Sequence, residues 1–113
     1  MKILSEKITK TELAEMSKKM FGNMVKAVAD IARGKMAIDG ELHSDLAELL
    51  IEDGSKGQNI WGFNIYPELE PPEWIEFDSM VNLKPLLDNR TRNVENLEIQ
   101  KKILAIVNNF IAP

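Results

Sequence analysis

The chain has 113 residues, of which 44% are hydrophobic and 28% charged, with a formal net charge of −4 and no cysteine. This length supports one hydrophobic core, so we expect a single domain over residues 1–113. The lack of cysteine excludes disulfides and thiolate metal sites, and the acidic balance argues against a protein-wide nucleic-acid surface.

No apolar run approaches the roughly 20 residues that a membrane helix needs, and the N-terminus has no apolar segment typical of a signal peptide. The phosphate-binding patterns GxxxxGK[ST] and GxGxxG are both missing. We therefore expect a cytoplasmic protein without a membrane contact, a nucleic-acid partner or a nucleotide cofactor.

The first predicted elements are an edge strand within residues 1–7 and a helix over residues 10–21. Thr9 and Glu12 have the spacing of a capping box, in which a hydroxyl and a carboxylate satisfy free N–H groups at a helix start. Apolar residues then recur from Leu13 at helical spacing. Gly22 supplies the left-handed residue that commonly ends a helix.

Residues 24–31 alternate in character, which predicts a strand, and residues 35–39 predict a returning strand after a turn at 32–34. A helix over residues 24–36 competes, because Val25, Val28 and Ile31 also have helical spacing.

Residues 41–52 fit two structures. Leu46, Leu49 and Leu50 suit a two-turn helix capped by Ser44, but they also suit a strand that ends at the turn 53–55. We favour the strand, because an Asp-Gly pair between apolar runs is typical of a hairpin.

The central feature is a predicted hairpin of two strands, residues 60–66 and 74–83, joined by the proline-rich segment 67–73. Trp61 and Phe63 share one face of the first strand, and Phe77 belongs to the apolar face of the second. The other face is polar, so we expect it to be exposed to water. Trp74 lies on that polar side and is expected as an exposed aromatic residue or a dimer contact.

A polar loop over residues 86–93 leads to a predicted helix over residues 94–110, with Asn93 as its cap. The predicted fold is therefore α+β, an antiparallel β-meander of about four strands packed against N- and C-terminal helices.

Four segments together resemble a small prokaryotic family known only as a domain of unknown function: ELHSDLAELLIEDGS, WGFNIYP, WIEFDSMVNLKP and DNRTRNVENLEIQKKI. The resemblance covers nearly the whole chain, and its most specific part is the WGxNxYP … WIEFDSMxNxxP … NRxR pattern. This chain has Lys84 where the family usually has Arg, and Asp88 where it usually has Gly. The resemblance implies one compact domain and transfers no activity.

The first candidate site combines Glu41, His43 and Asp45. On a strand these three side chains would share one face, where they could bind a divalent cation or act as general acid and base. Their spacing matches no established metal motif, and a solvated polar turn is the simpler interpretation.

The second candidate is the polar face of the hairpin, where Asn64, Asp78 and Asn82 accompany Glu76. Clustered carboxylates there would attract a cation. The simpler interpretation is an antiparallel sheet with one wet face.

The third candidate is a basic loop with Lys84, Arg90 and Arg92, which could bind an anion at a helix start. A merely solvated loop is the simpler interpretation here too.

These candidate sites suggest three functions for the protein, and the sequence contains no catalytic motif that supports any of them. We favour a binding or interaction module that acts as a homo-oligomer or subunit, because edge strands invite pairing. The alternatives are a small metal-assisted or acid/base enzyme around His43, and an anion or nucleic-acid binder through Lys84, Arg90 and Arg92.

Overall fold

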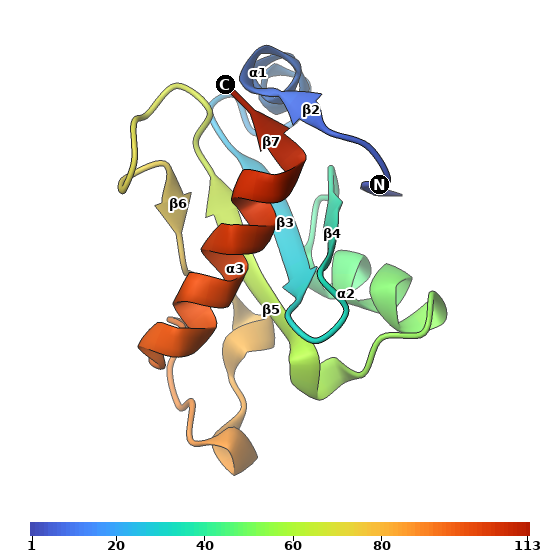
Figure 1. The fold of residues 1–113 in the computed structure, drawn as a ribbon, viewed down its shortest axis with the longest axis vertical. Coiled ribbons are helices and arrows are strands. Elements are labelled where there is room, and N and C mark those ends of the chain that lie inside the picture. The colour runs from blue at the N-terminus through green and yellow to red at the C-terminus, as the bar shows by residue number, and fades with distance from the viewer.

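A five-stranded antiparallel sheet runs through the middle of the molecule (Figure 1). The structure is a computed structural model that describes residues 1–113. The strands lie in the order β1, β4, β3, β5 and β6. Their bounds are Lys2–Ile3 for β1, Lys35–Ile38 for β4, Val25–Asp30 for β3, Ile60–Ile65 for β5 and Ile75–Glu76 for β6.

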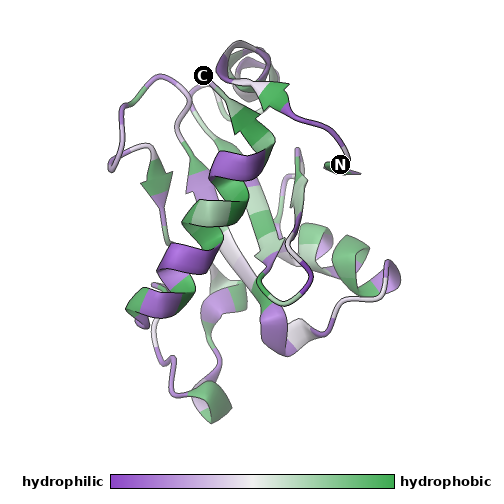
Figure 2. Cartoon of the chain, in the orientation of Figure 1, coloured by the Kyte–Doolittle hydropathy of each residue, from purple (hydrophilic) through white to green (hydrophobic).

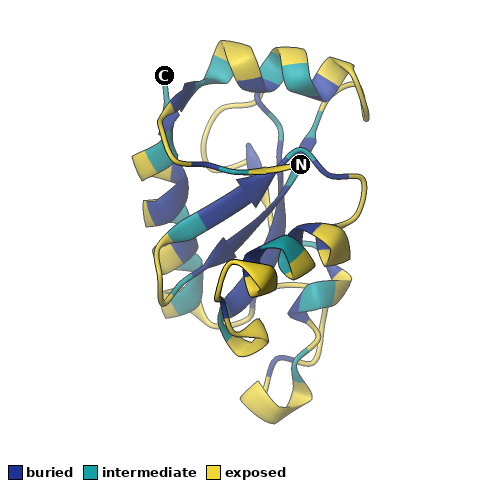
Figure 3. Cartoon of the chain, turned by 90° about the vertical axis from the view of Figure 1, so that its right-hand side faces the viewer, coloured by how far each residue is buried: buried dark blue, intermediate teal, exposed yellow.

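Helices cover both faces of this sheet, as the side view in Figure 3 makes clear. The C-terminal helix α3, Leu97–Phe110, lies along one face, and α2, His43–Glu52, lies on the other (Figure 1). The N-terminal helix α1, Lys10–Lys18, crosses one end. Next to it, the two-residue strands β2, Ile8–Thr9, and β7, Ile111–Ala112, form a parallel pair that joins segments from both ends of the chain.

Each face of the sheet has its own hydrophobic core. On the α3 face, alternate residues of β5 such as Trp61 and Phe63 pack with α1 and α3. On the α2 face, Ile60 packs with Leu46 and Leu50 of α2. Because both faces are covered, all six residues of β5 are buried.

The predicted fold class and several local predictions are confirmed. The chain is α+β, with an antiparallel sheet against N- and C-terminal helices. The predicted strand pair became β3 and β4, whose residues pair from Ala27↔Ile38 to Asp30↔Lys35. The hydroxyl of Thr9 accepts a hydrogen bond from the N–H of Glu12 at 3.1 Å, so α1 begins at the predicted cap.

The prediction of a strand over residues 41–52 is wrong, because most of this segment forms the helix α2. The Asp53-Gly54 pair ends that helix and does not turn a hairpin. Gly54 takes a φ of +109°, and the N–H groups of Gly54 and Ser55 bond the carbonyls of Ile51 and Leu50. This is the Schellman arrangement, in which a left-handed glycine lets the chain satisfy the last helical carbonyls.

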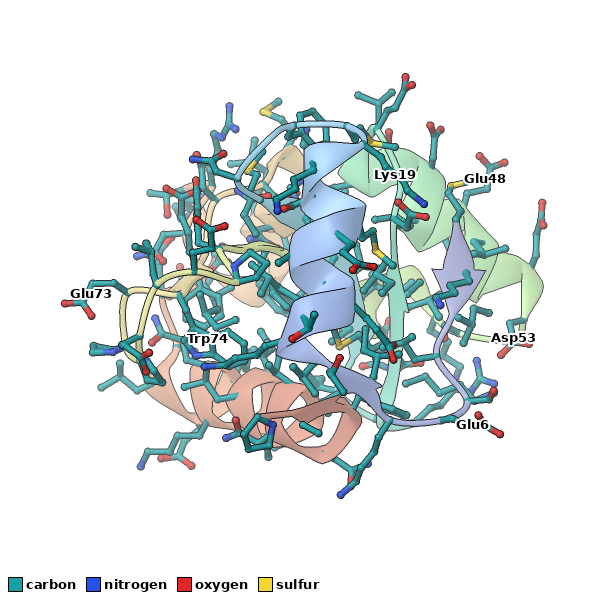
Figure 4. All side chains as sticks on the ribbon, turned by 90° about the horizontal axis from the view of Figure 1, so that it is seen from above. Glu6, Lys19, Glu48, Asp53, Glu73 and Trp74 are labelled. Atoms are coloured by element: carbon teal, nitrogen blue, oxygen red, sulfur yellow. The ribbon has the colours of Figure 1, made fainter.

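The hairpin exists, but its second strand is much shorter than predicted. Only Ile75–Glu76 pairs with β5, and Met80–Asn82 forms a 3₁₀ turn. The expected exposure of the polar face is wrong for Asn64 and Asn82, which are 5% and 0% exposed, whereas Glu76 is exposed and Asp78 half-buried. Trp74 is buried as well, and in Figure 4 it is turned inward while Glu73 points outward.

The last helix begins three residues later than predicted. Asn96, and not Asn93, is its cap: the side-chain oxygen of Asn96 accepts the N–H groups of Glu98 and Ile99. No helix in the structure is long and apolar enough to cross a membrane.

Candidate functional site

A cavity of about 180 Å³ opens on the α2 side of the sheet. It lies between the start of α2, strand β3 and the segment that contains the 3₁₀ turn Met80–Asn82. Its lining combines cationic, hydroxyl, imidazole and apolar groups: Lys26, Leu42, His43, Ser44, Ser79, Met80, Val81 and Arg92. These residues come from four separate parts of the chain.

His43 forms the buried wall of this cavity, with 8% of its surface exposed. Its Nε2 lies 2.9 Å from the carbonyl oxygen of Phe63, and because a carbonyl can only accept, Nε2 carries the proton. Burial lowers the pKa of His43, and the charge of Lys26 lowers it further, while the Phe63 carbonyl opposes the shift. The neutral ring therefore presents Nδ1 as a hydrogen-bond acceptor.

Asn64 stands beside this imidazole at a fixed position in the sheet, where it is the register partner of both Lys26 in β3 and Glu76 in β6. Its Nδ2 donates to Oε1 of Glu76 at 2.9 Å. Its Oδ1 is buried without a hydrogen-bond partner, although the Asn64 side chain acts on His43 by raising its pKa. Asn64 is not among the residues that line the cavity, so this buried oxygen lies behind the wall formed by His43 and is not a contact for a ligand.

The charged groups leave the cavity weakly positive. Lys26 makes no ion pair, and its Nζ lies 5.1 Å from the ring centre of Phe21. Arg92 Nε donates to Asp78 Oδ1 at 2.6 Å. With two cations, one carboxylate and a neutral imidazole, the net charge of this group is one positive.

The start of α2 adds unused N–H groups. Leu42 is the N-cap residue and has no side chain that can accept a hydrogen bond, so the N–H groups of His43 and Ser44 have no acceptor in the protein. Free N–H groups and the helix dipole favour negative charge at such a position.

The first predicted site does not assemble as expected. Glu41, His43 and Asp45 share no strand face, since His43 and Asp45 lie in the first turn of α2. Asp45 lines a different depression, with Met1 and Glu48. Nowhere in the structure do three His, Asp or Glu side chains gather closely enough to hold a metal ion.

The second predicted site is partly assembled. Asn64 Nδ2 lies 3.4 Å from the backbone oxygen of Asp78, and the charge of Asp78 acts on His43. Asn82 has a different position, because its side chain bonds both backbone groups of Gly62 and the carbonyl of Arg92. Asn82 therefore connects segments of the fold.

The three cations of the third predicted site have separate partners. Lys84 Nζ donates to the carbonyls of Gly57 and Val81, and burial lowers its pKa. Arg90 Nε lies 3.4 Å from Asp88, and Arg92 pairs with Asp78 as described above.

The basic loop already holds an anion from its own chain. The carboxylate of Glu95 accepts hydrogen bonds from the N–H groups of Arg90 and Thr91 and from the Thr91 hydroxyl. These hydrogen bonds lower the pKa of Glu95.

Sequence reasoning missed Lys26, Leu42, Ser44, Ser79 and Met80 as neighbours of His43. A signal for Lys26 was present, because its position in the alternating strand 24–31 places it on the opposite face from Val25 and Ala27. Nothing in the sequence indicated that this face meets the start of α2.

The groups around His43 come from separate parts of the chain and differ in chemistry. Together they place a neutral imidazole acceptor, free N–H donors and a small positive charge in one depression with apolar residues at its edge. No curated protein and no solved structure matches the chain. A family model described as "Protein of unknown function (DUF5674)" matches residues 2–110, and the chain belongs to that family.

Proposed function

We propose that the protein is a binding module whose ligand is a small carboxylate held in the cavity beside His43. The observation that carries this proposal is the convergence of Lys26, Arg92 and the free N–H groups of His43 and Ser44 on one depression. Groups that donate hydrogen bonds and carry positive charge stabilise an anion together, and hydrogen bonds to an ionised group are the stronger kind.

The charge balance favours a monoanion. The carboxylate of Asp78 balances the charge of Arg92, and Lys26 leaves one net positive charge, so a carboxylate is matched in charge and a dianionic phosphate is not. The cavity volume of about 180 Å³ also suits a small ligand.

The test is an NMR titration of the ¹⁵N-labelled protein with sodium acetate, with sodium phosphate and sodium chloride at matched ionic strength as references. We expect saturable shifts of the His43 and Ser44 amide signals with acetate, weaker shifts with phosphate and none with chloride.

A pair of variants links the shifts to the cavity. Lys26→Gln removes the unpaired cation and should weaken acetate binding several-fold, because it removes a charge-assisted contact. Lys102→Gln is the matched control, since Lys102 is exposed on α3 and outside the cavity. An unchanged affinity in Lys26→Gln, or no saturable shift at His43 and Ser44 in the wild type, would refute the proposal.

A second candidate function is self-association through the 3₁₀ turn Pro85–Leu87. This turn projects from one end of the molecule (Figure 1), and Figure 2 colours part of it hydrophobic. Leu86 is 101% exposed and Leu87 51%. The turn is fixed at its base by the backbone pairing of Lys84 with Asn89. Leu86 and Leu87 together give this turn an apolar tip, which a contact with a second copy of the chain would cover.

Light scattering across a concentration series tests this candidate. We expect a dimer for the wild type and a monomer for Leu86→Asp, while Leu69→Asp, at another exposed leucine in the 67–73 segment, should remain dimeric. A wild type that stays monomeric at all concentrations would eliminate it.

A further inference from the structure

We propose that the carboxylate bound beside His43 belongs to an N-acylated apolar α-amino acid, either as a free molecule or as the last residue of a polypeptide. This inference rests on the proposed carboxylate site and adds the chemistry of the rest of the ligand. Three features of the cavity correspond to three groups of such a residue.

The first group is the carboxylate. Lys26 and the uncapped N–H groups of His43 and Ser44 are suited to bind it. The two Nη groups of the Arg92 guanidinium, which make no hydrogen bond in the protein, are further donors. These donors belong to strand β3, to the start of α2 and to the loop before α3, so the site is more than the end of one helix.

The second group is an amide N–H next to the carboxylate. His43 is buried, with 8% of the residue exposed, and its hydrogen bond to the Phe63 carbonyl uses Nε2. His43 lines the cavity, and its Nδ1 is left as an acceptor that makes no hydrogen bond to the Phe63 carbonyl. A ligand with only a carboxylate would bring acceptors alone to this nitrogen, whereas an amide N–H can donate a hydrogen bond to it.

The third group is an apolar side chain. Leu42 and Met80 line the same cavity, and they remain 53% and 63% exposed. Two exposed apolar side chains beside a cationic depression fit an apolar group attached to the carboxylate-bearing carbon. Methionine adapts its shape to different partners, so we expect a preference for apolar side chains in general.

A series of four small probes separates these groups, with affinities measured by NMR titration. N-acetyl-leucine carries all three, N-acetylglycine lacks the apolar side chain, 4-methylpentanoate lacks the amide N–H, and N-acetyl-leucinamide lacks the carboxylate. We expect N-acetyl-leucine to bind tightest. Loss of the carboxylate should cost more than about tenfold in affinity, and loss of the isobutyl group about tenfold.

Variants at the mouth of the cavity test the apolar contact without touching the donors. Leu42→Ala and Met80→Ala should each reduce the affinity for N-acetyl-leucine more than the affinity for N-acetylglycine, and so lower the ratio of the two affinities. Leu97→Ala is the matched control, because Leu97 is equally apolar and 68% exposed but does not line the cavity.

The outcomes of these titrations distinguish the inference about an N-acylated amino acid from the proposal that the cavity binds a carboxylate. If acetate and N-acetylglycine bind as tightly as N-acetyl-leucine, the carboxylate site stands and the inference is overturned. If no carboxylate binds, both fail. An octapeptide that ends in leucine distinguishes the two sources: binding of the peptide and its loss on C-terminal amidation indicate a polypeptide terminus, and binding of N-acetyl-leucine alone indicates a free molecule.

Discussion

The side chain of Asn82 pairs with the backbone of Gly62 as a neighbouring strand would. Asn82 Oδ1 accepts the Gly62 N–H at 2.8 Å, and Asn82 Nδ2 donates to the Gly62 carbonyl at 2.9 Å. Strand β6 has ended by this point, so the carboxamide satisfies backbone groups of β5 that would otherwise be buried and unpaired. Gly62 is required here, because a Cβ at this position would lie 2.5 Å from the Ser79 hydroxyl.

Replacing Asn82 by Ala should destabilise the protein by about 3 kcal/mol, since the change leaves buried groups of Gly62 without partners. Urea unfolding followed by circular dichroism measures this effect. Asn109→Ala, at an exposed position of α3, should stay within about 0.5 kcal/mol of the wild type. An equally small effect for Asn82→Ala would contradict the pairing as a source of stability.

Leu42→Asp should have opposite effects on stability and on binding. The backbone of Leu42 has the extended geometry of an N-cap, but its side chain cannot accept the free N–H groups. An aspartate there should stabilise the protein by about 1 kcal/mol, measured as a higher Tm.

The same carboxylate should also compete with added acetate for those N–H groups, so acetate binding should weaken. Leu69→Asp, outside the helices, serves as the control for added charge. A variant that binds acetate as tightly as the wild type would show that the N–H groups of α2 take no part in binding.

Stability should decrease as the pH falls below the ordinary pKa of histidine, because the pKa of His43 is lowered by burial in the fold. The unfolded chain takes up a proton near pH 6.5, whereas the folded protein takes it up only at lower pH. The unfolded state therefore binds more protons in this window, and the stability present above pH 6.5 is progressively lost below it.

Urea unfolding between pH 5 and 8 measures this slope, and His43→Gln should remove it while keeping an N–H group that can face the Phe63 carbonyl. His43 is the only histidine, so its ring signal also reports its pKa directly by NMR. A His43 pKa at or above 6.5 in the free protein would contradict the buried neutral ring, whereas a rise on adding acetate is expected from a bound negative charge.

Glu95→Gln should loosen the basic loop. The Glu95 carboxylate accepts the N–H groups of Arg90 and Thr91, and a neutral amide oxygen is a weaker acceptor than a carboxylate. We expect faster amide hydrogen exchange at these two residues, with little change in the strands. Glu98→Gln, which affects only an exposed pair with Lys101, is the matched control, and equal exchange in both variants would contradict this role.

The sequence by itself determined those helices and strands for which capping residues and hydrophobic spacing indicate the same structure. Thr9 and Glu12 placed the start of α1, and the alternation in residues 24–31 gave β3. These predictions held because capping and period-two alternation act within a few residues of the chain. The Asp53-Gly54 pair shows where local signals fail, because a left-handed glycine serves the end of a helix and a hairpin turn equally well.

The tertiary structure decided which polar residues became neighbours. Sequence reasoning singled out His43, Asn64, Asp78 and Arg92, but it grouped His43 with Glu41 and Asp45 on a strand that does not exist. The register of β3 with β5 places Lys26 beside Asn64, and the packing of α2 brings His43 to the carbonyl of Phe63. Contacts between residues twenty or more positions apart depend on how whole elements pack, and no local pattern in the chain encodes that packing.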